Sequence, residues 1–159
     1  MAAMDGKREL LRHAVATVAY RATRALEDAP EEFAGFAGCG RTPAKILAHL
    51  GDLFDWALSQ AKGEERWHNS EPLPWAEEKA RFYASLEAFD QALAAPEPIH
   101  APEEKLFQGA VADSLTHVGQ LAMMRRLAGS PAWSENFSVA GIAAGRVGAD
   151  QAEAVKRFR

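Results

Sequence analysis

The spacing of apolar residues along the chain predicts four amphipathic helices in series. In the first, from about Lys7 to Leu26, apolar residues recur at three- and four-residue steps, which places them on one helical face. The second has the clearest start signal, because Thr42 can cap it and Pro43 occupies the first helical position, where a missing N–H costs nothing. We expect this helix to end near Gly63 and residues 63–74 to form a long loop.

The third and fourth helices follow the same periodicity. The third begins near Trp75 or Ala76 and ends before the three prolines that lie within residues 95–102. The fourth runs from about Glu103 to Leu127, and Gly129–Pro131 terminates it. We expect the glycine-containing tail to pack against the helices and to end in a short helix over residues 150–158. The predicted fold is therefore all-α, a four-helix bundle with a C-terminal extension.

Composition narrows the class of protein. The chain has 159 residues, 48% of them apolar, so we expect a single domain over residues 1–159 with a real core. We expect a cytoplasmic protein, because no apolar segment approaches a membrane span and the first residues do not resemble a secretory signal. The net charge of -4 and the scattered basic residues argue against nucleic acid or a membrane surface as partner. Cys39 is the only cysteine, which excludes an intrachain disulfide and a thiolate zinc cluster.

Three polar side chains interrupt the apolar stripes of the second and fourth helices. His49 lies three residues after Ile46 and so shares the buried face of the second helix. Asp113 and His117 are four residues apart on the fourth helix and point the same way. Burying an ionised carboxylate without a partner costs several kcal/mol. A divalent ion between the two helices would satisfy all three side chains, and it would leave positions open for water or substrate.

A second interpretation needs no metal. Asp113 and His117 could form an i, i+4 hydrogen-bonded couple, with His49 a satisfied histidine of the core. The spacing alone leaves the two interpretations open.

Other polar residues could act near this site. Gln120 lies one turn beyond His117, where it could orient that ligand or point to a helix edge. Arg125 and Arg126 complement the helix dipole or, alternatively, clamp an anionic substrate. The remaining histidines, His13, His68 and His100, are expected to face solvent.

Two segments resemble a known family. The segments TPAKILAHLGDLFDWAL (residues 42–58) and DSLTHVGQLAMMRRLAG (residues 113–129) resemble the DinB-like (YfiT-like) family of metalloenzymes. Members of that family are four-helix bundles that bind a metal through one His of the second helix and an HxxxH pair of the fourth, often followed by xGQ. His49 and the HVGQ stretch opened by His117 match this pattern, whereas Asp113 replaces the first His of the pair.

The resemblance implies a divalent metal held by His49, Asp113 and His117. A two-His, one-carboxylate set suits iron, nickel, manganese or zinc, and we expect zinc or nickel before iron or manganese. The implied function is that of a metal-dependent enzyme, a thiol-dependent transferase or a hydrolase. Its substrate would be a small molecule, with a low-molecular-weight thiol as a further partner, and the protein would be a homodimer. Two alternatives stay open: a non-catalytic metal-binding stress-response protein, and a non-haem iron protein.

Overall fold

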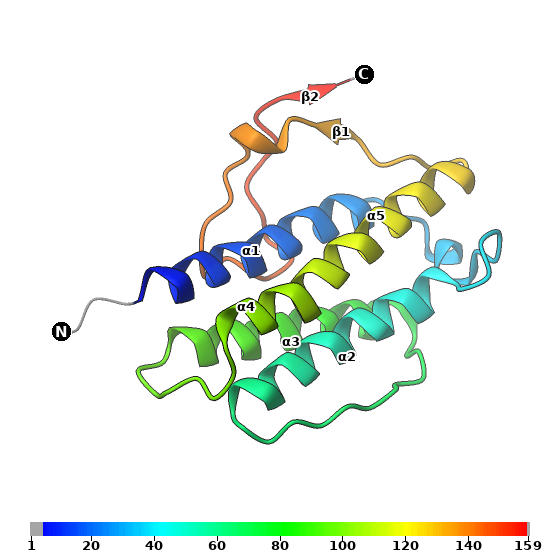
Figure 1. Cartoon of the computed structure of the whole chain (residues 1–159). Coiled ribbons are helices and arrows are strands. Elements are labelled where there is room, and N and C mark those ends of the chain that lie inside the picture. Colours follow the sequence, from blue (N-terminus) through cyan, green and yellow to red (C-terminus); the bar gives the residue numbers. More distant parts are fainter. Residues whose placement is uncertain (1–4, 159) are drawn as a thin grey trace.

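The structure is a computed structural model that describes residues 5–158. Four helical runs dominate this part of the chain (Figure 1). They are α1 (Gly6–Leu26), α2 (Pro43–Ala61), α3 (Trp75–Ala94), and a last run made of α4 (Glu103–Leu106), the π-helical turn η2 (Phe107–Val111) and α5 (Ala112–Leu127). A short 3-10 helix, η1 (Glu31–Gly35), lies in the connection between α1 and α2.

Local capping explains where the helices begin and end. The Asp5 side chain accepts a hydrogen bond from the Lys7 N–H at 3.3 Å at the start of α1. Thr42 Oγ1 accepts one from the Lys45 N–H, also at 3.3 Å, at the start of α2. Gly63 follows α2 with φ +76°, and Gly129 follows α5 with φ +80°, a left-handed conformation that glycine adopts without strain. The predicted bounds of the four helices are confirmed to within two residues.

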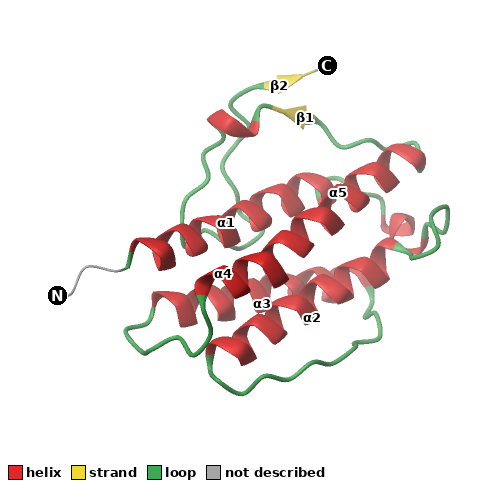
Figure 2. Cartoon of the chain, in the orientation of Figure 1, coloured by secondary structure: helices red, strands yellow, loops and turns green. Residues whose placement is uncertain are grey.

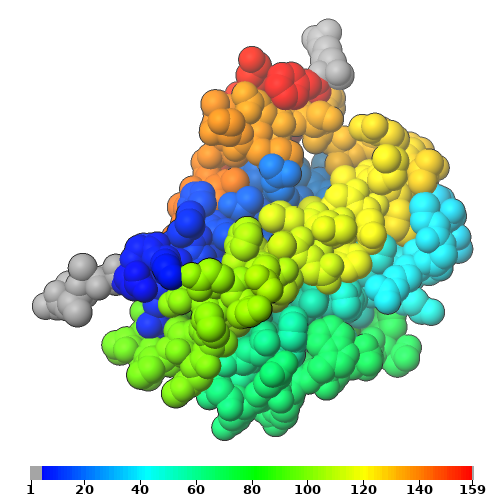
Figure 3. Space-filling model, in the orientation of Figure 1, coloured from blue at the N-terminus to red at the C-terminus, as the bar shows by residue number. Residues whose placement is uncertain are grey.

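Each helical run packs against two neighbours. Both α1 and α2 contact α3 on one side and α5 on the other, and Figures 1 and 3 show α5 lying alongside α2. The apolar faces meet between the runs and form one cluster of buried side chains. Its largest fully buried apolar members are Phe54, Phe82, Phe89, Leu47, Leu50, Leu86, Leu93, Leu106, Leu121 and Met124. The described residues are thus mostly helical, as predicted.

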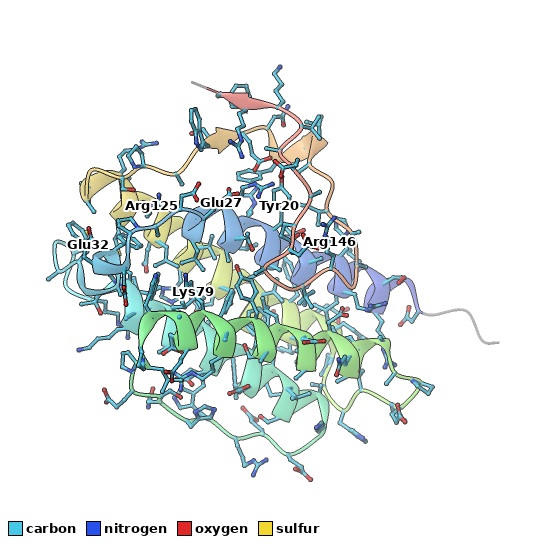
Figure 4. The ribbon with its side chains drawn as sticks, turned by 180° about the vertical axis from the view of Figure 1, so that it is seen from behind. Tyr20, Glu27, Glu32, Lys79, Arg125 and Arg146 are labelled. Carbon is cyan, nitrogen blue, oxygen red and sulfur yellow. The ribbon has the colours of Figure 1, made fainter. Side chains whose placement is uncertain are left out.

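The predicted helix over residues 150–158 is wrong. Residues Arg157–Phe158 form strand β2, which pairs antiparallel with β1 (Ser134–Glu135), and a 3-10 turn, η3 (Phe137–Val139), follows β1. Side chains of α1 hold this tail extended: Arg24 Nε donates to Glu135 Oε1 at 2.8 Å, and Arg24 also donates to the Ala152 carbonyl. Tyr20 donates to Glu135 Oε2 at 2.7 Å and lies beneath the tail in Figure 4.

A long connection, residues 62–74, runs beside α2 and is called the strap below. It contains no helix or strand and is drawn as the loop joining α2 to α3 in Figure 2. This confirms the predicted loop. None of the helices in the described part of the chain combines the length and apolar character that a membrane crossing requires.

Candidate metal centre

The three predicted ligands meet at one point between α2 and α5. His49 Nε2 lies 3.5 Å from Asp113 Oδ2, and His117 Nε2 lies 3.4 Å from the same oxygen. The two imidazole rings face each other edge to face, with centroids 4.8 Å apart. Two nitrogen atoms and one oxygen atom therefore surround a common position, and this group could hold a metal ion.

The distances bear on the choice between a metal and a hydrogen-bonded couple. A charge-assisted N–H···O bond is about 2.7–2.9 Å long, so separations of 3.4 and 3.5 Å are long for one. Ligand atoms held about 2.1 Å from a tetrahedral ion, by contrast, lie about 3.4 Å from one another. The spacing of these donor atoms thus matches ligands of a shared ion better than a hydrogen-bonded pair.

Gln120 fixes the orientation of one ligand. Its Oε1 lies 2.8 Å from His117 Nδ1, and because a carbonyl oxygen can only accept, the ring carries its proton on Nδ1. In the neutral form of the ring with this tautomer, the Nε2 atom, which faces Asp113, carries a free lone pair. A hydrogen bond to the far ring nitrogen is the usual partner of a metal-bound histidine. Gln120 therefore has the orienting contact that was one of its two predicted roles.

The prediction that Asp113 lies on a buried stripe is wrong, because its side chain is 45% exposed. The π turn η2 lies just before Asp113, and because a π turn takes one more residue than an α turn, it rotates the positions that follow it. The buried residues of α5 are Ser114, Val118, Leu121, Met124 and Arg125, and His117 is only partly buried. Asp113 keeps contact with water, so the free-energy cost of burying its charge is not evidence for a bound cation. The case for a metal rests on the convergence of the donor atoms.

His49 occupies a partly buried position beside the strap. Its side chain is 21% exposed, and its ring meets Trp67 of the strap edge to face at 5.7 Å. Burial lowers the pKa of His49, and the charges of His117 and Arg41 lower it further, whereas Asp113 raises it. The imidazole therefore stays neutral, and able to bind a metal, to a lower pH than an ordinary histidine.

A second group of ligand-type side chains fastens the strap to α2. Ser70 donates to both oxygens of the buried Asp52 carboxylate, from N at 2.7 Å and from Oγ at 2.6 Å. His68 bridges two carboxylates, with Nδ1 3.2 Å from Asp52 Oδ1 and Nε2 3.2 Å from Asp55 Oδ2. Burial raises the pKa of Asp55, and the neighbouring His68 opposes that shift.

The second group differs in geometry from the first. Asp52, Asp55 and His68 could also hold a metal. However, the two 3.2 Å contacts of His68 use different ring nitrogens, whereas in the first group both imidazoles approach the same carboxylate oxygen. The sequence offered a partial signal, because Asp52 and Asp55 follow His49 at successive three-residue steps along α2. Nothing in the sequence indicated that His68, expected to face solvent, would reach them.

The arginines at the end of α5 lie outside the centre. Arg125 is buried and donates from Nη1 to the carbonyls of Ala25 (2.9 Å) and Glu27 (2.8 Å), next to which Figure 4 labels it. It therefore caps the C-terminal end of α1 instead of clamping a substrate. Arg126, His13 and His100 are exposed.

A groove of about 400 Å³ opens beside His117. It lies between the connection that precedes α2 and the outer face of α5, and we call it the His117 groove. Its lining residues are Cys39, Arg41, Ile46, His117, Gln120, Met123 and Met124. A volume of this order suits a small organic molecule.

The chain was compared with protein-family models, with curated proteins and with solved structures, and none of the three comparisons found a match. The DinB-like resemblance of residues 42–58 and 113–129 stays a prediction. The fold and the site define a mostly helical protein with two residue groups that could hold a metal ion.

Proposed function

We propose that the chain is a metal-dependent enzyme of the DinB-like kind. In this proposal the four helical runs form a four-helix bundle, and His49, Asp113 and His117 hold one divalent ion. The observation that carries it is the convergence of two imidazole nitrogens on a single carboxylate oxygen at 3.4–3.5 Å. Support also comes from position, because the segments that resemble the family, residues 42–58 and 113–129, lie in α2 and α5, which supply all three ligands.

The residues around the centre suit a catalytic rather than a purely structural metal. Three protein ligands leave coordination positions for water or substrate, and the half-exposed Asp113 leaves the centre open to solvent. When bound, the metal would supply a Lewis acid that activates a water or a thiol. The protein contributes the orientation of His117 through Gln120 and a wall beside His49 through Trp67. The proposed reactions are thiol-dependent group transfer and hydrolysis of a small molecule.

The experiment is a metal analysis followed by a variant series. Protein purified without added metal is analysed by mass spectrometry for bound metals, and zinc affinity is then measured by calorimetry. We expect one tightly bound ion per chain. His49→Ala should lower the zinc affinity by at least about tenfold, since it removes one of three ligands.

The matched control is His68→Ala, which removes the only imidazole of the second group. It should leave one tight ion in place. If His49→Ala retained the full metal content while His68→Ala lost it, the ion would bind between the strap and α2, and the proposed centre would be refuted.

The identity of the metal separates the three functional hypotheses. Zinc or nickel, together with thiol binding in the calorimeter, supports a thiol-dependent transferase. Iron with oxygen sensitivity supports a non-haem iron protein. A tightly bound metal with no thiol binding in the calorimeter supports a non-catalytic metal-binding protein, provided that removing the metal with a chelator greatly lowers the melting temperature.

A further inference from the structure

The His117 groove combines an apolar surface with one uncommitted positive charge. Arg41 is exposed, and its guanidinium makes no ion pair or hydrogen bond with any other residue between 5 and 158. The chain as a whole is acidic, and the partly buried Arg12 and Arg81 pair with carboxylates. Arg41 therefore differs from them in having its donors free at the rim of a groove.

The charge of Arg41 lies beside the candidate metal centre. Arg41 lines the same groove as His117, so its guanidinium lies near one of the three ligands. The residues that line the groove within the described chain include no carboxylate that could neutralise it. A ligand that entered the groove would thus meet the positive charge of Arg41.

Gln120 adds a second donor to the same groove. Its Oε1 is occupied by His117 Nδ1, so the amide N–H₂ is the part of the side chain left for a ligand. Beside it, Met123 and Met124 contribute flexible apolar surface, and Ile46 lines the side formed by α2. The groove is therefore rich in donors and apolar atoms, and poor in acceptors.

We propose that the His117 groove binds a small molecule with a carboxylate at one end and an apolar body. The carboxylate pairs with Arg41, the body lies on Ile46, Met123 and Met124, and the other end reaches the metal position beside His117. One planar guanidinium matches the single charge and two oxygens of a carboxylate, whereas a phosphate dianion would favour more than one cation. This inference rests on the proposed function and names the substrate class of that centre.

The experiment compares two metal-binding probes of equal chain length on the zinc-loaded protein. Both butyrohydroxamic acid and succinic monohydroxamic acid bind metal through the hydroxamate, but only the second ends in a carboxylate. Calorimetry should give about fivefold tighter binding of the carboxylate probe, the upper range for an exposed ion pair. Arg41→Gln should remove that preference. Arg126→Gln, which removes an exposed positive charge elsewhere on the chain, should retain it.

The outcomes distinguish this inference from the proposed function. If zinc binds and the wild-type protein treats the two probes alike, the inference is refuted and the metal centre stands. The same holds if Arg41→Gln keeps the full preference. If zinc does not bind at all, or binds equally well to His49→Ala, the centre itself fails and the inference fails with it.

Discussion

The hydrogen bond between Gln120 and His117 offers a sharp test of the centre. Gln120→Leu keeps a side chain of similar size but removes Oε1, the acceptor that lies 2.8 Å from His117 Nδ1. Without it, the ring can rotate or move its proton to Nε2, the atom that faces Asp113. Either change would leave the lone pair of Nε2 unavailable for a metal until the ring is reoriented. Zinc affinity should therefore fall.

The size of the effect follows from the exposure of Gln120. Loss of such an orienting partner generally lowers metal affinity by about 10–100-fold. Gln120 is exposed, so water can replace part of its hydrogen bond and the loss should lie at the lower end. We expect about a tenfold weaker affinity, which corresponds to about 1.4 kcal/mol. Gln120→Glu should bind zinc at least as tightly as the wild type, because a carboxylate accepts the bond more strongly.

The assay is competition for zinc with a chromophoric chelator at pH 7. Gln108→Leu is the matched control, since Gln108 is exposed on η2 of the same helical run and makes no side-chain hydrogen bond within residues 5–158. It should leave the affinity unchanged. If Gln120→Leu binds zinc within a factor of two of the wild type, the hydrogen bond does not prepare His117 for a metal.

Three further predictions concern stability and the strap. The pKa of His49 is lowered from 6.5 in the folded protein, so as the pH falls this histidine is protonated in the unfolded chain before it is protonated in the folded one. Thermal melts of the metal-free protein should therefore show stability falling as the pH drops below about 6.5. An equal dependence of stability on pH in His49→Gln would contradict this. His68→Ala should speed tryptic cleavage after Arg66 in the strap, whereas equal rates would show that His68 does not hold it. Glu135→Ala should cost about 3 kcal/mol in urea unfolding, the lower end for a broken buried pair, because buried Arg24 loses its closest carboxylate and keeps only Glu27 at 3.6 Å. The exposed Glu153→Ala is the control, and equal loss in both variants would refute the role of the pair.

Helix bounds were predictable because their causes are local. Thr42 and Pro43 start α2 through their own chemistry, and Gly63 ends it through its left-handed backbone. The loop over residues 63–74 was predictable for the same reason, because Gly63, Pro72 and Pro74 disfavour a helix locally. The centre was partly predictable as well, since an i, i+4 pair on one helix and a histidine on another identified the three residues that converge.

The predictions failed where a distant contact or an irregular turn decided the outcome. The π turn at Phe107–Val111 moved Asp113 away from the buried stripe, and Gly109 lets Trp56 approach that turn, since a Cβ there would lie 3.3 Å from the indole. The tail was expected to be helical at its end, but Arg24 and Tyr20 of α1 hold it extended through Glu135. No periodicity within the tail encodes those partners.

The sequence by itself determined the four helical runs, their order and the side chains that could bind a metal, because spacing along a helix and capping depend on near neighbours. Tertiary structure alone decided how those side chains are used. It brought His49 within 3.5 Å of Asp113, let His68 reach across from the strap to Asp52 and Asp55, and left Arg41 free at the rim of a groove. Such distances depend on how separate segments pack, and packing reflects the whole set of buried contacts rather than any one stretch of residues.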